Sequence, residues 1–283
     1  MDNFATICEG LSADGAIQMS ETYEVLVLKY ACHHTRTRAQ NFLWTDDHAS
    51  PEPLDFFIWV IRNANRTILV DTGFDTVEAN RRGRPLDLEP VEALKRVGIA
   101  AEDINTIVIT HLHHDHAGTL DHFPAARFHI QESEVAYATG ACMCEESMRG
   151  PYSADHICSF VKKIYSGRVK FHDGDAEIAP GITVHAVPGH TKGLQCVRVA
   201  TQSGPLVLAS DAAHYYENFE RRQPFSVTLD VEQTLRSYTR LEQLAGSNTR
   251  IVPGHDPLVL QRYPAWKPQT QGFVHRLDVP RLK

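Results

Sequence analysis

Five side chains that can bind a metal ion lie within six consecutive positions of this chain. They are His111, His113, His114, Asp115 and His116. Packing rarely produces such a cluster, because buried polar groups are costly unless they are paired or bind a metal. Imidazole with carboxylate is a ligand set that suits zinc, manganese or iron. We therefore interpret residues 111–116 as the nucleus of a metal site.

The spacing within this cluster predicts two groups of ligands. His111 and His113 share parity, so both imidazoles can face one ion from an extended segment. Asp115 and His116 follow where the chain begins to turn, and they can face a second ion. We expect His114, at the variable position between them, to face away from the metals. One segment supplies only four ligands, so a two-metal site needs others from elsewhere.

Three further candidate ligands each follow an apolar run that is typical of a buried strand. They are His190 after residues 182–186, Asp211 after residues 206–210 and His255 after residues 251–253. Residues 104–110 form a similar β-branched run before the histidine cluster. Because α/β proteins build their sites on loops that leave the carboxyl ends of strands, we expect these four loops to meet.

The rest of the chain supplies the elements that must position these loops. We expect strands at residues 23–30, 56–62 and 67–70, with a turn at 63–66 that makes a hairpin. A helix is predicted over residues 90–97, with Pro90 in its first turn and Gly98 at its end. A late helix over residues 235–244 stops at Gly246.

The pattern between residues 131 and 170 becomes helical and polar, with helices predicted over residues 132–138 and 156–165. We interpret this segment as a helical insertion, a lid or substrate-shaping element, in a single domain that spans residues 1–283. Four aromatic residues are candidates for an apolar wall of the site, although such residues more often belong to the core. They are Phe42, Trp44, Phe219 and Phe225.

Composition is that of one compact enzyme, with 283 residues of which 42% are hydrophobic and 22% charged. The net charge of −7 argues against a nucleic-acid partner. The first twenty residues lack a leader pattern and no run of eighteen apolar residues occurs, so we expect neither export nor a membrane span. Six cysteines without zinc-ribbon spacing fit reduced thiols, which favours the cytoplasm.

The motif His-x-His-x-Asp-His, formed by residues 111–116, resembles that of the metallo-β-lactamase superfamily. The later ligands of that superfamily match His190, Asp211 and His255, and residues 70–73 match its early Asp-Thr-Gly turn. The match covers roughly residues 23–260. The resemblance implies an αββα sandwich, in which helices flank two mixed sheets and a dinuclear site lies at one edge. We expect Asp71 of the early turn to orient a ligand histidine rather than to bind metal.

The ligand set indicates which branches of the superfamily the chain resembles. A cysteine-ligating β-lactamase would have Cys in place of Asp211, and the oxygen-reducing flavodiiron branch would have glutamate in place of His113. Five histidines and two aspartates resemble the glyoxalase II and N-acyl homoserine lactone lactonase branches, which both hydrolyse at an acyl carbon. The glyoxalase alternative, a thioester hydrolase, would want a cationic patch near the C-terminus. Arg276, Arg281 and Lys283 could only loosely serve.

Residues 211–219, Asp-Ala-Ala-His-Tyr-Tyr-Glu-Asn-Phe, are similar to the lactonase stretch Asp-Ala-x-Tyr-x-x-Glu-Asn-Phe. In that family the tyrosine donates a hydrogen bond to the reacting carbonyl or oxyanion. This chain has His214 at that position. Either His214 or Tyr215 takes over the role, or the substrate differs from acyl homoserine lactones. Catabolic lactonases, including 4-pyridoxolactonase, are a second resemblance, and the motifs do not choose between them.

The resemblance implies that two divalent ions, zinc or else manganese or iron, share a hydroxide that attacks the carbonyl of a small lactone. One ion would be held by His111, His113 and His190, and would polarise the carbonyl. The other would be held by Asp115, His116 and His255, with Asp211 shared between the two ions. Asp115 would carry the proton to the leaving oxygen. If the lactone is an acyl homoserine lactone, the enzyme would quench quorum signalling. We expect the protein to be a monomer or a homodimer.

Overall fold

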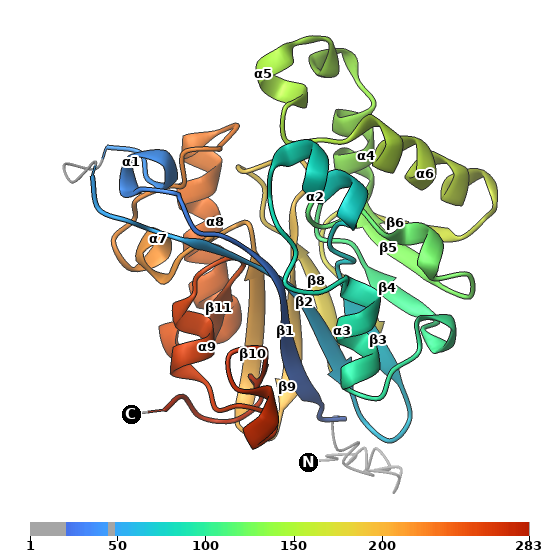
Figure 1. Ribbon diagram of the computed structural model, residues 1–283, viewed down its shortest axis with the longest axis vertical. Helices are drawn as coiled ribbons and strands as arrows, with labels where there is room; N and C mark the ends of the chain where they lie inside the picture. Colours follow the sequence, from blue (N-terminus) through green and yellow to red (C-terminus); the bar gives the residue numbers. More distant parts are fainter. Residues whose placement is uncertain (1–20, 45–48, 283) are drawn as a thin grey trace, which may run out of the picture.

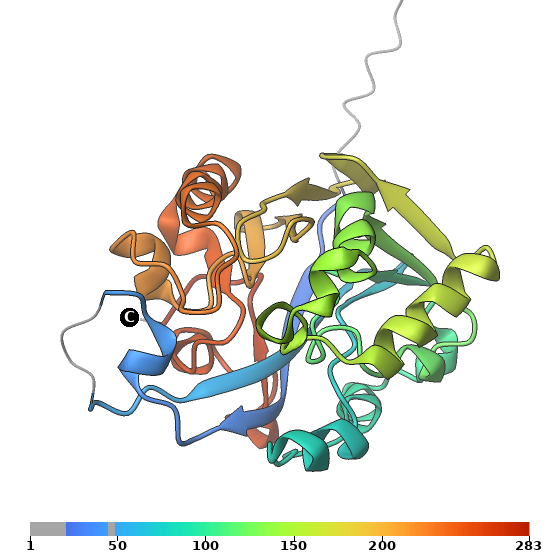
Figure 2. The same cartoon turned by 90° about the horizontal axis from the view of Figure 1, so that it is seen from above.

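Two β-sheets pack face to face between two groups of helices (Figures 1 and 2). The computed structural model describes residues 21–44 and 49–282. Both sheets are mixed, since each combines antiparallel and parallel neighbours. This arrangement confirms the predicted αββα sandwich. Cys8, His48 and the segment 1–20, on which the leader prediction depends, lie outside the described residues.

The larger sheet begins with antiparallel strands and ends with parallel ones. Its order is β12 (Val274–Arg276), β1 (Glu24–His33), β2 (Leu54–Arg62), β3 (Thr67–Val70), β4 (Thr106–Val108), β5 (Arg127–Gln131) and β6 (Val169–His172). The smaller sheet has the order β11 (Ile251–Pro253), β10 (Gly204–Ser210), β9 (Gln195–Thr201), β8 (Ile182–Ala186) and β7 (Ala176–Ala179).

Helices cover the outer faces of both sheets. The larger sheet carries α2 (Thr76–Arg82), α3 (Pro90–Arg96), α4 (Glu132–Ala138), α5 (Glu146–Arg149) and α6 (Ala154–Tyr165), and α7 (Tyr216–Glu220), α8 (Val231–Ala245) and α9 (Leu258–Arg262) lie on the other side. The short α1 (Arg38–Asn41) follows β1, and 3₁₀ turns occur at Ala101–Asp103, Leu120–His122, Ala141–Cys144, Asn248–Arg250 and Pro268–Thr270. Among the helices of the described residues, none combines the length and apolarity that a membrane crossing would need.

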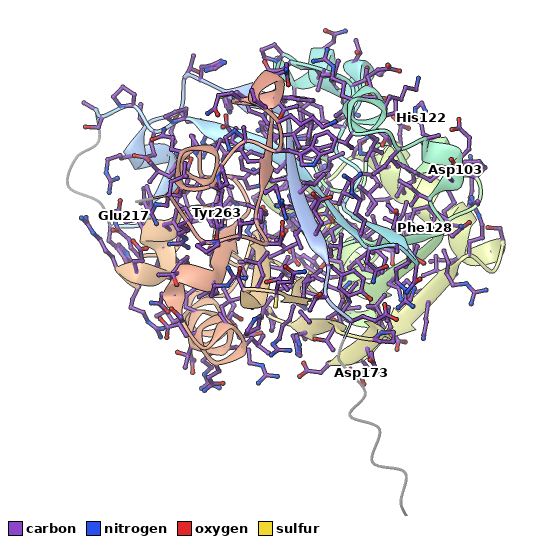
Figure 3. All side chains as sticks on the ribbon, turned by 90° about the horizontal axis from the view of Figure 1, so that it is seen from below. Asp103, His122, Phe128, Asp173, Glu217 and Tyr263 are labelled. Carbon is purple, nitrogen blue, oxygen red and sulfur yellow. The ribbon has the colours of Figure 1, made fainter. Side chains whose placement is uncertain are left out.

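Alternation along the strands builds two cores. In β1, Leu26 and Leu28 face the helices of the larger sheet, whereas Val25 and Val27 face the smaller sheet, as the period of two requires. Phe128 lies in the first core and Tyr263 in the second, on opposite sides of β1 in Figure 3. The hydrophobic effect therefore fixes the separation of the two sheets and brings their strand ends to one edge.

The predicted elements agree closely with the structure. Helix α4 coincides with the predicted 132–138, and α8 contains the predicted 235–244 and ends at Gly246, whose φ is 68°. Strand β4 is shorter than the predicted 104–110 at both ends, because the amide of Ile104 bonds Ala101 in the preceding 3₁₀ turn and Thr110 leaves the ladder. The amide of Thr110 donates to the carboxylate of Asp71 at 2.7 Å instead of to a strand. The helical segment between residues 131 and 170 forms the crossover that joins parallel strands β5 and β6.

Candidate metal centre

The four ligand-bearing loops meet at one edge of the sandwich. The motif loop leaves β4, while His190, Asp211 and His255 follow β8, β10 and β11. All seven predicted ligands are buried, with exposed fractions between 0% and 7%. Their ligand atoms form two groups, each within 4.8 Å: His111, His113, His190 and Asp211 in one, and Asp115, His116 and His255 in the other. The structure therefore brings together the residues that the spacing and the resemblance assigned to each ion.

Asp211 stands between the two groups and offers one oxygen to each. Its Oδ2 lies 3.2 Å from Nε2 of His190 and 3.7 Å from Nε2 of His111. Its Oδ1 lies 2.9 Å from Nε2 of His255 and 3.2 Å from Nε2 of His116. A carboxylate with this geometry can bridge two cations.

The outer nitrogens of three ligand histidines are held by acceptors. Nδ1 of His190 donates to the carbonyl of Val227 at 2.6 Å, and Nδ1 of His255 donates to the carbonyl of Asp55 at 2.7 Å. A carbonyl oxygen can only accept, so Nδ1 carries the proton and Nε2 presents a lone pair to the centre. Such outer partners are typical of metal-ligating histidines.

His116 is held in the same way by Asp71. Its Nδ1 donates to Oδ2 of that carboxylate at 2.7 Å. Asp71 also accepts bonds from the amide and hydroxyl of Thr110, at 2.7 and 2.8 Å, and the same hydroxyl lies 2.8 Å from Oγ of Ser210. This chain of bonds links the carboxyl ends of β3 and β4 in one sheet to that of β10 in the other. Asp71 takes the orienting role that the sequence predicts for it.

Several ligand atoms have no hydrogen-bond partner although they are buried. These are Nε2 of His111, Nε2 of His116 and Oδ1 of Asp211. Buried polar atoms are almost always satisfied, so converging unsatisfied lone pairs call for a bound group. Oxygen and nitrogen donors without thiolate suit hard or borderline divalent cations. The donor set therefore fits two such ions.

The pKa values of the histidines in the cluster shift in different directions. Burial and the neighbouring imidazoles lower the pKa of His111 and His113 well below its ordinary value. Burial would also lower the pKa of His116, but the carboxylates of Asp211, Asp115 and Asp71 raise it well above that value. The neutral imidazoles of His111 and His113 are in the protonation state that metal binding needs.

Glu134 is a buried residue of the site that the motifs did not reveal. From α4 its carboxylate accepts bonds from the amides of Leu112 at 3.0 Å and Gly193 at 3.1 Å, and from the hydroxyls of Thr191 at 2.6 Å and Tyr152 at 3.3 Å. It therefore connects the motif loop, the loop that carries His190 and the helical crossover. Its position on a helix gave no signal in the sequence, because an isolated glutamate there is usually exposed.

His114, which we expected to face away from the metals, has both ring nitrogens bound to other partners. It is not among the ligand groups, yet it lies in the wall of the cavity beside Asp115, with Nδ1 3.3 Å from the Oδ1 of that carboxylate. Its Nδ1 donates to the carbonyl of Pro151 at 3.0 Å, so its Nε2 accepts a bond from Arg84 at 2.8 Å. These two partners turn the ring toward the cavity.

The two candidate oxyanion donors lie in different surroundings. His214 lines the cavity, its Nε2 is 3.0 Å from Oδ2 of Asp211, and burial lowers its pKa to about 3. The hydroxyl of Tyr215 instead contacts Nδ2 of Asn41 at 2.7 Å and lies outside the cavity wall. The structure brings only His214 to the metal ligands.

The four candidate wall aromatics separate in the same way. Phe225 lines the cavity and stacks on His214 with a centroid distance of 3.5 Å. Phe42 packs on Tyr215, Phe219 lies in the second core and Trp44 is 74% exposed. Of the four candidates, only Phe225 lies in the apolar wall of the cavity, which also includes Leu54, Phe56 and Val227.

The cavity over the centre has a volume of about 320 Å³. The basic residues near the C-terminus do not reach it. Arg276 pairs with Asp278 at 2.6 Å, and Arg281 donates to the backbone of Ile251 at 2.9 Å. Lys283 lies outside the described residues. No described basic residue from this end of the chain lines the cavity, so the cationic patch expected for a glutathione thioester is not formed by these residues.

The fold and the bridged ligand set define a dinuclear metallohydrolase, and the chain belongs to the metallo-beta-lactamase superfamily, whose family model matches residues 55–255. A curated N-acyl homoserine lactonase from Bacillus sp. is 32% identical over 225 residues, which cover 72% of this chain and 83% of that protein. The crystal structure of a quorum-quenching N-acyl homoserine lactone lactonase has 26% identity and a TM-score of 0.70, and the match covers 84% of this chain and 94% of that one. Another solved lactone hydrolase, with N-hexanoyl-L-homoserine bound at its catalytic metal center, has 26% identity and a TM-score of 0.69, and the match covers 83% of this chain and 94% of that one.

We predict that Glu134→Gln weakens metal binding and destabilises the fold. The amide group would turn N–H donors toward the N–H and O–H donors that now meet a carboxylate, so about 2 kcal/mol of the free energy of unfolding should be lost. Urea denaturation and titration with zinc measure the two effects. Glu132→Gln, at an exposed position of the same helix, is the matched control. Equal stability and zinc affinity of the two variants would contradict the role of Glu134.

Proposed function

We propose that this chain is a dinuclear metal-dependent hydrolase that opens the ring of a lactone. The observation that carries the proposal is the bridged set of seven ligands in a chain whose relatives are N-acyl homoserine lactonases. Lactone opening is hydrolysis of an internal ester. Two divalent cations in the site would supply Lewis acidity and a nucleophile derived from water at neutral pH.

Asp115 is the residue that we assign to proton transfer. Its Oδ2 lies 3.6 Å from Nε2 of His116 and 3.7 Å from Nε2 of His255, among the ligands. Its Oδ1 lies on the side of His114, in the cavity wall. A carboxylate with one oxygen at the metals and one toward the cavity can take a proton from the attacking water and deliver it to the ring oxygen that leaves.

His214 is the residue that we assign as donor to the reacting carbonyl oxygen. Its low pKa keeps the imidazole neutral, with one proton, at physiological pH. The stacked ring of Phe225 fixes its orientation, and Nε2 lies beside the bridging carboxylate. We do not assign this role to Tyr215, because its hydroxyl accepts a bond from Asn41, donates its proton to the carbonyl of Pro53 at 3.2 Å and lies outside the cavity wall.

The thioester alternative lacks comparable support. It would need cationic groups from the C-terminal end to hold the carboxylates of glutathione, and Arg276 and Arg281 are committed to partners elsewhere. A curated relative at 32% identity is an N-acyl homoserine lactonase. We therefore rank lactone hydrolysis first.

Zinc is the metal that we propose for both positions, since the histidine-rich ligand set suits it best. We also propose that the protein works in the cytoplasm, because the five cysteines of the described residues are all unpaired. Whether the chain acts as a monomer or a homodimer stays a prediction for light scattering to decide.

We expect metal-loaded protein to open lactones and to lose this activity on chelation. The panel should contain short- and long-chain acyl homoserine lactones, simple γ-lactones and pyridoxolactone, with S-lactoylglutathione alongside. Elemental analysis should give two divalent ions per chain, and zinc should restore the activity that chelation removes. Cleavage of the thioester alone would overturn the lactonase proposal in favour of the glyoxalase alternative.

We expect Asp115→Asn to lose at least ~100-fold in kcat, the usual worth of general acid–base catalysis, while much of the metal stays bound. The amide can still coordinate through oxygen but cannot carry a proton. The assay is turnover of the best lactone by protein of measured metal content. A rate near that of the wild type would refute the proton-transfer role.

We expect His214→Phe to lower kcat by about 100-fold, as loss of an oxyanion donor does. His214→Tyr should recover most of the rate, because a phenol restores the donor that the lactonase motif has here. Tyr215→Phe is the control and should leave kcat within about threefold, since its hydroxyl serves only structure. If Tyr215→Phe were the damaging change and His214→Phe were not, the assignment would be reversed.

A further inference from the structure

The wall of the cavity is rich in positive charge, although the chain as a whole has a net charge of −7. Three arginines line it: Arg36, Arg82 and Arg84. The only carboxylates in the described wall are Asp115 and Asp211, which belong to the metal centre. Two carboxylates offset only half the charge of two divalent cations. The loaded cavity is therefore strongly cationic.

Arg82 has a structural explanation. Its guanidinium forms an ion pair with Glu78 and donates to the carbonyls of Gly150 at 3.0 Å and Tyr152 at 2.9 Å. Its charge is neutralised within the protein. The other two arginines differ in this respect.

Arg84 has no carboxylate partner within the part of the chain that the structure describes. Its Nη1 donates to Nε2 of His114 at 2.8 Å, and its guanidinium lies 5.7 Å from the ring centroid of Phe56. One imidazole ring therefore separates this charge from Asp115, whose Oδ1 lies 3.3 Å from the other nitrogen of His114.

Arg36 is likewise without an ion pair across residues 21–44 and 49–282. It donates to the side-chain oxygen of Asn41 and to the carbonyl of Gln40, both neutral acceptors. Its guanidinium lies 5.4 Å from the ring centroid of Phe225, which stacks on His214. Two stacked rings, Phe225 and His214, therefore separate this second charge from Asp211.

The positive charges of the two guanidinium groups repel each other. Burial lowers the pKa of both, and Arg84 lowers that of Arg36 further. Both stay charged, because an arginine in a protein does not lose its proton. His33, also in the wall, has a buried Nδ1 with no partner, and burial and both arginines lower its pKa to about 4. A neutral imidazole is thus available beside two unpaired cations.

Partly buried charges without a partner are unfavourable, so a protein usually pairs them. The neighbouring Arg38 follows the rule, with Glu217 at 2.6 Å and Glu52 at 3.2 Å. Arg36 and Arg84, which line the cavity, have no such carboxylate partner among the described residues. The neutral acyl chain of an acyl homoserine lactone would leave these charges unpaired and less hydrated. A carboxylate would pair with them through the planar donor edges of the guanidinium groups.

We propose that the substrate is a lactone that carries a carboxylate close to its ring, and that Arg36 and Arg84 are the residues that select it. This inference rests on the proposed lactonase function and names its substrate class. Arg84 is one ring from the metal centre and Arg36 is two rings from it, and both line the cavity. This position places the anionic group near the reacting ring rather than at the end of a long chain.

The test compares two nearly isosteric γ-lactones, 5-oxotetrahydrofuran-2-carboxylate and its carboxamide. The metal-loaded wild type should have a kcat/KM at least about tenfold higher for the acid, the worth of one hydrogen bond to a charged group. Arg36→Met and Arg84→Met should each lower kcat/KM for the acid by about tenfold or more and leave the amide nearly unchanged. Arg84→Lys should retain part of the preference, because the charge persists.

Arg81→Met is the matched control, since Arg81 lies on α2, has a 58% exposed side chain and is absent from the cavity wall. Melting temperature and metal content of each variant identify losses that come from misfolding. An acid-to-amide ratio that stays the same in all variants, or a wild type that prefers the amide, would overturn the inference.

If the protein opens neither lactone, binding of the acid and of the amide to the metal-loaded chain should be measured by calorimetry. Failure to open any lactone of the wider panel would refute the proposed function. Binding of the acid that weakens in the Arg36 and Arg84 variants, but not in Arg81→Met, would still support the anion site. Absence of acid binding to the wild type, or binding that no arginine variant weakens, would refute it.

Discussion

The convergence of buried lone pairs at one point is the constraint on which the rest of the structure depends. Five imidazoles and two carboxylates cannot satisfy one another, because Nε2 of His111 and Oδ1 of Asp211 remain without hydrogen bonds. Cations resolve this conflict and hydrogen bonds within the protein do not. The strands, loops and outer acceptors all serve to hold these atoms close together before any ion binds.

Both sheets share in holding the cluster. The bonds from Asp71 through Thr110 to Ser210 join strand ends that belong to different sheets. Asp71 and Ser210 also adopt positive φ values, 59° and 48°, which cost a non-glycine residue roughly 1 kcal/mol or more. The hydrogen-bond network supports this strained backbone exactly where ligands leave the strands, so stability is given up locally for the placement of His116 and Asp211.

The sequence was sufficient for the sandwich and for a candidate ligand set that the structure brings to one edge, since the motif residues are close in the chain and each later candidate follows a recognisable strand. It was insufficient for groups that reach the site only through tertiary contacts. Glu134 on a helix, and Arg36 and Arg84 in loops, carry no local pattern that separates them from surface charges. The place of His114 in the cavity wall could not be predicted either, because its partners Pro151 and Arg84 are distant in the chain. The choice between His214 and Tyr215 depended on Asn41, which is 174 positions from Tyr215.

The bonds of Glu134 have a consequence for how this enzyme can diversify. Glu134 and Tyr152 are joined at 3.3 Å, and the chain between them includes Ser147, Gly150 and Pro151, which line the cavity. The segment is therefore clamped at its base, and Ser147 is the residue of its outer part that reaches the cavity wall. Residues 139–149 can be lengthened, shortened or replaced while the clamp keeps the ligand loops in place. Lineages with this clamp can change substrate by exchanging one short stretch of chain and need not rebuild the metal centre.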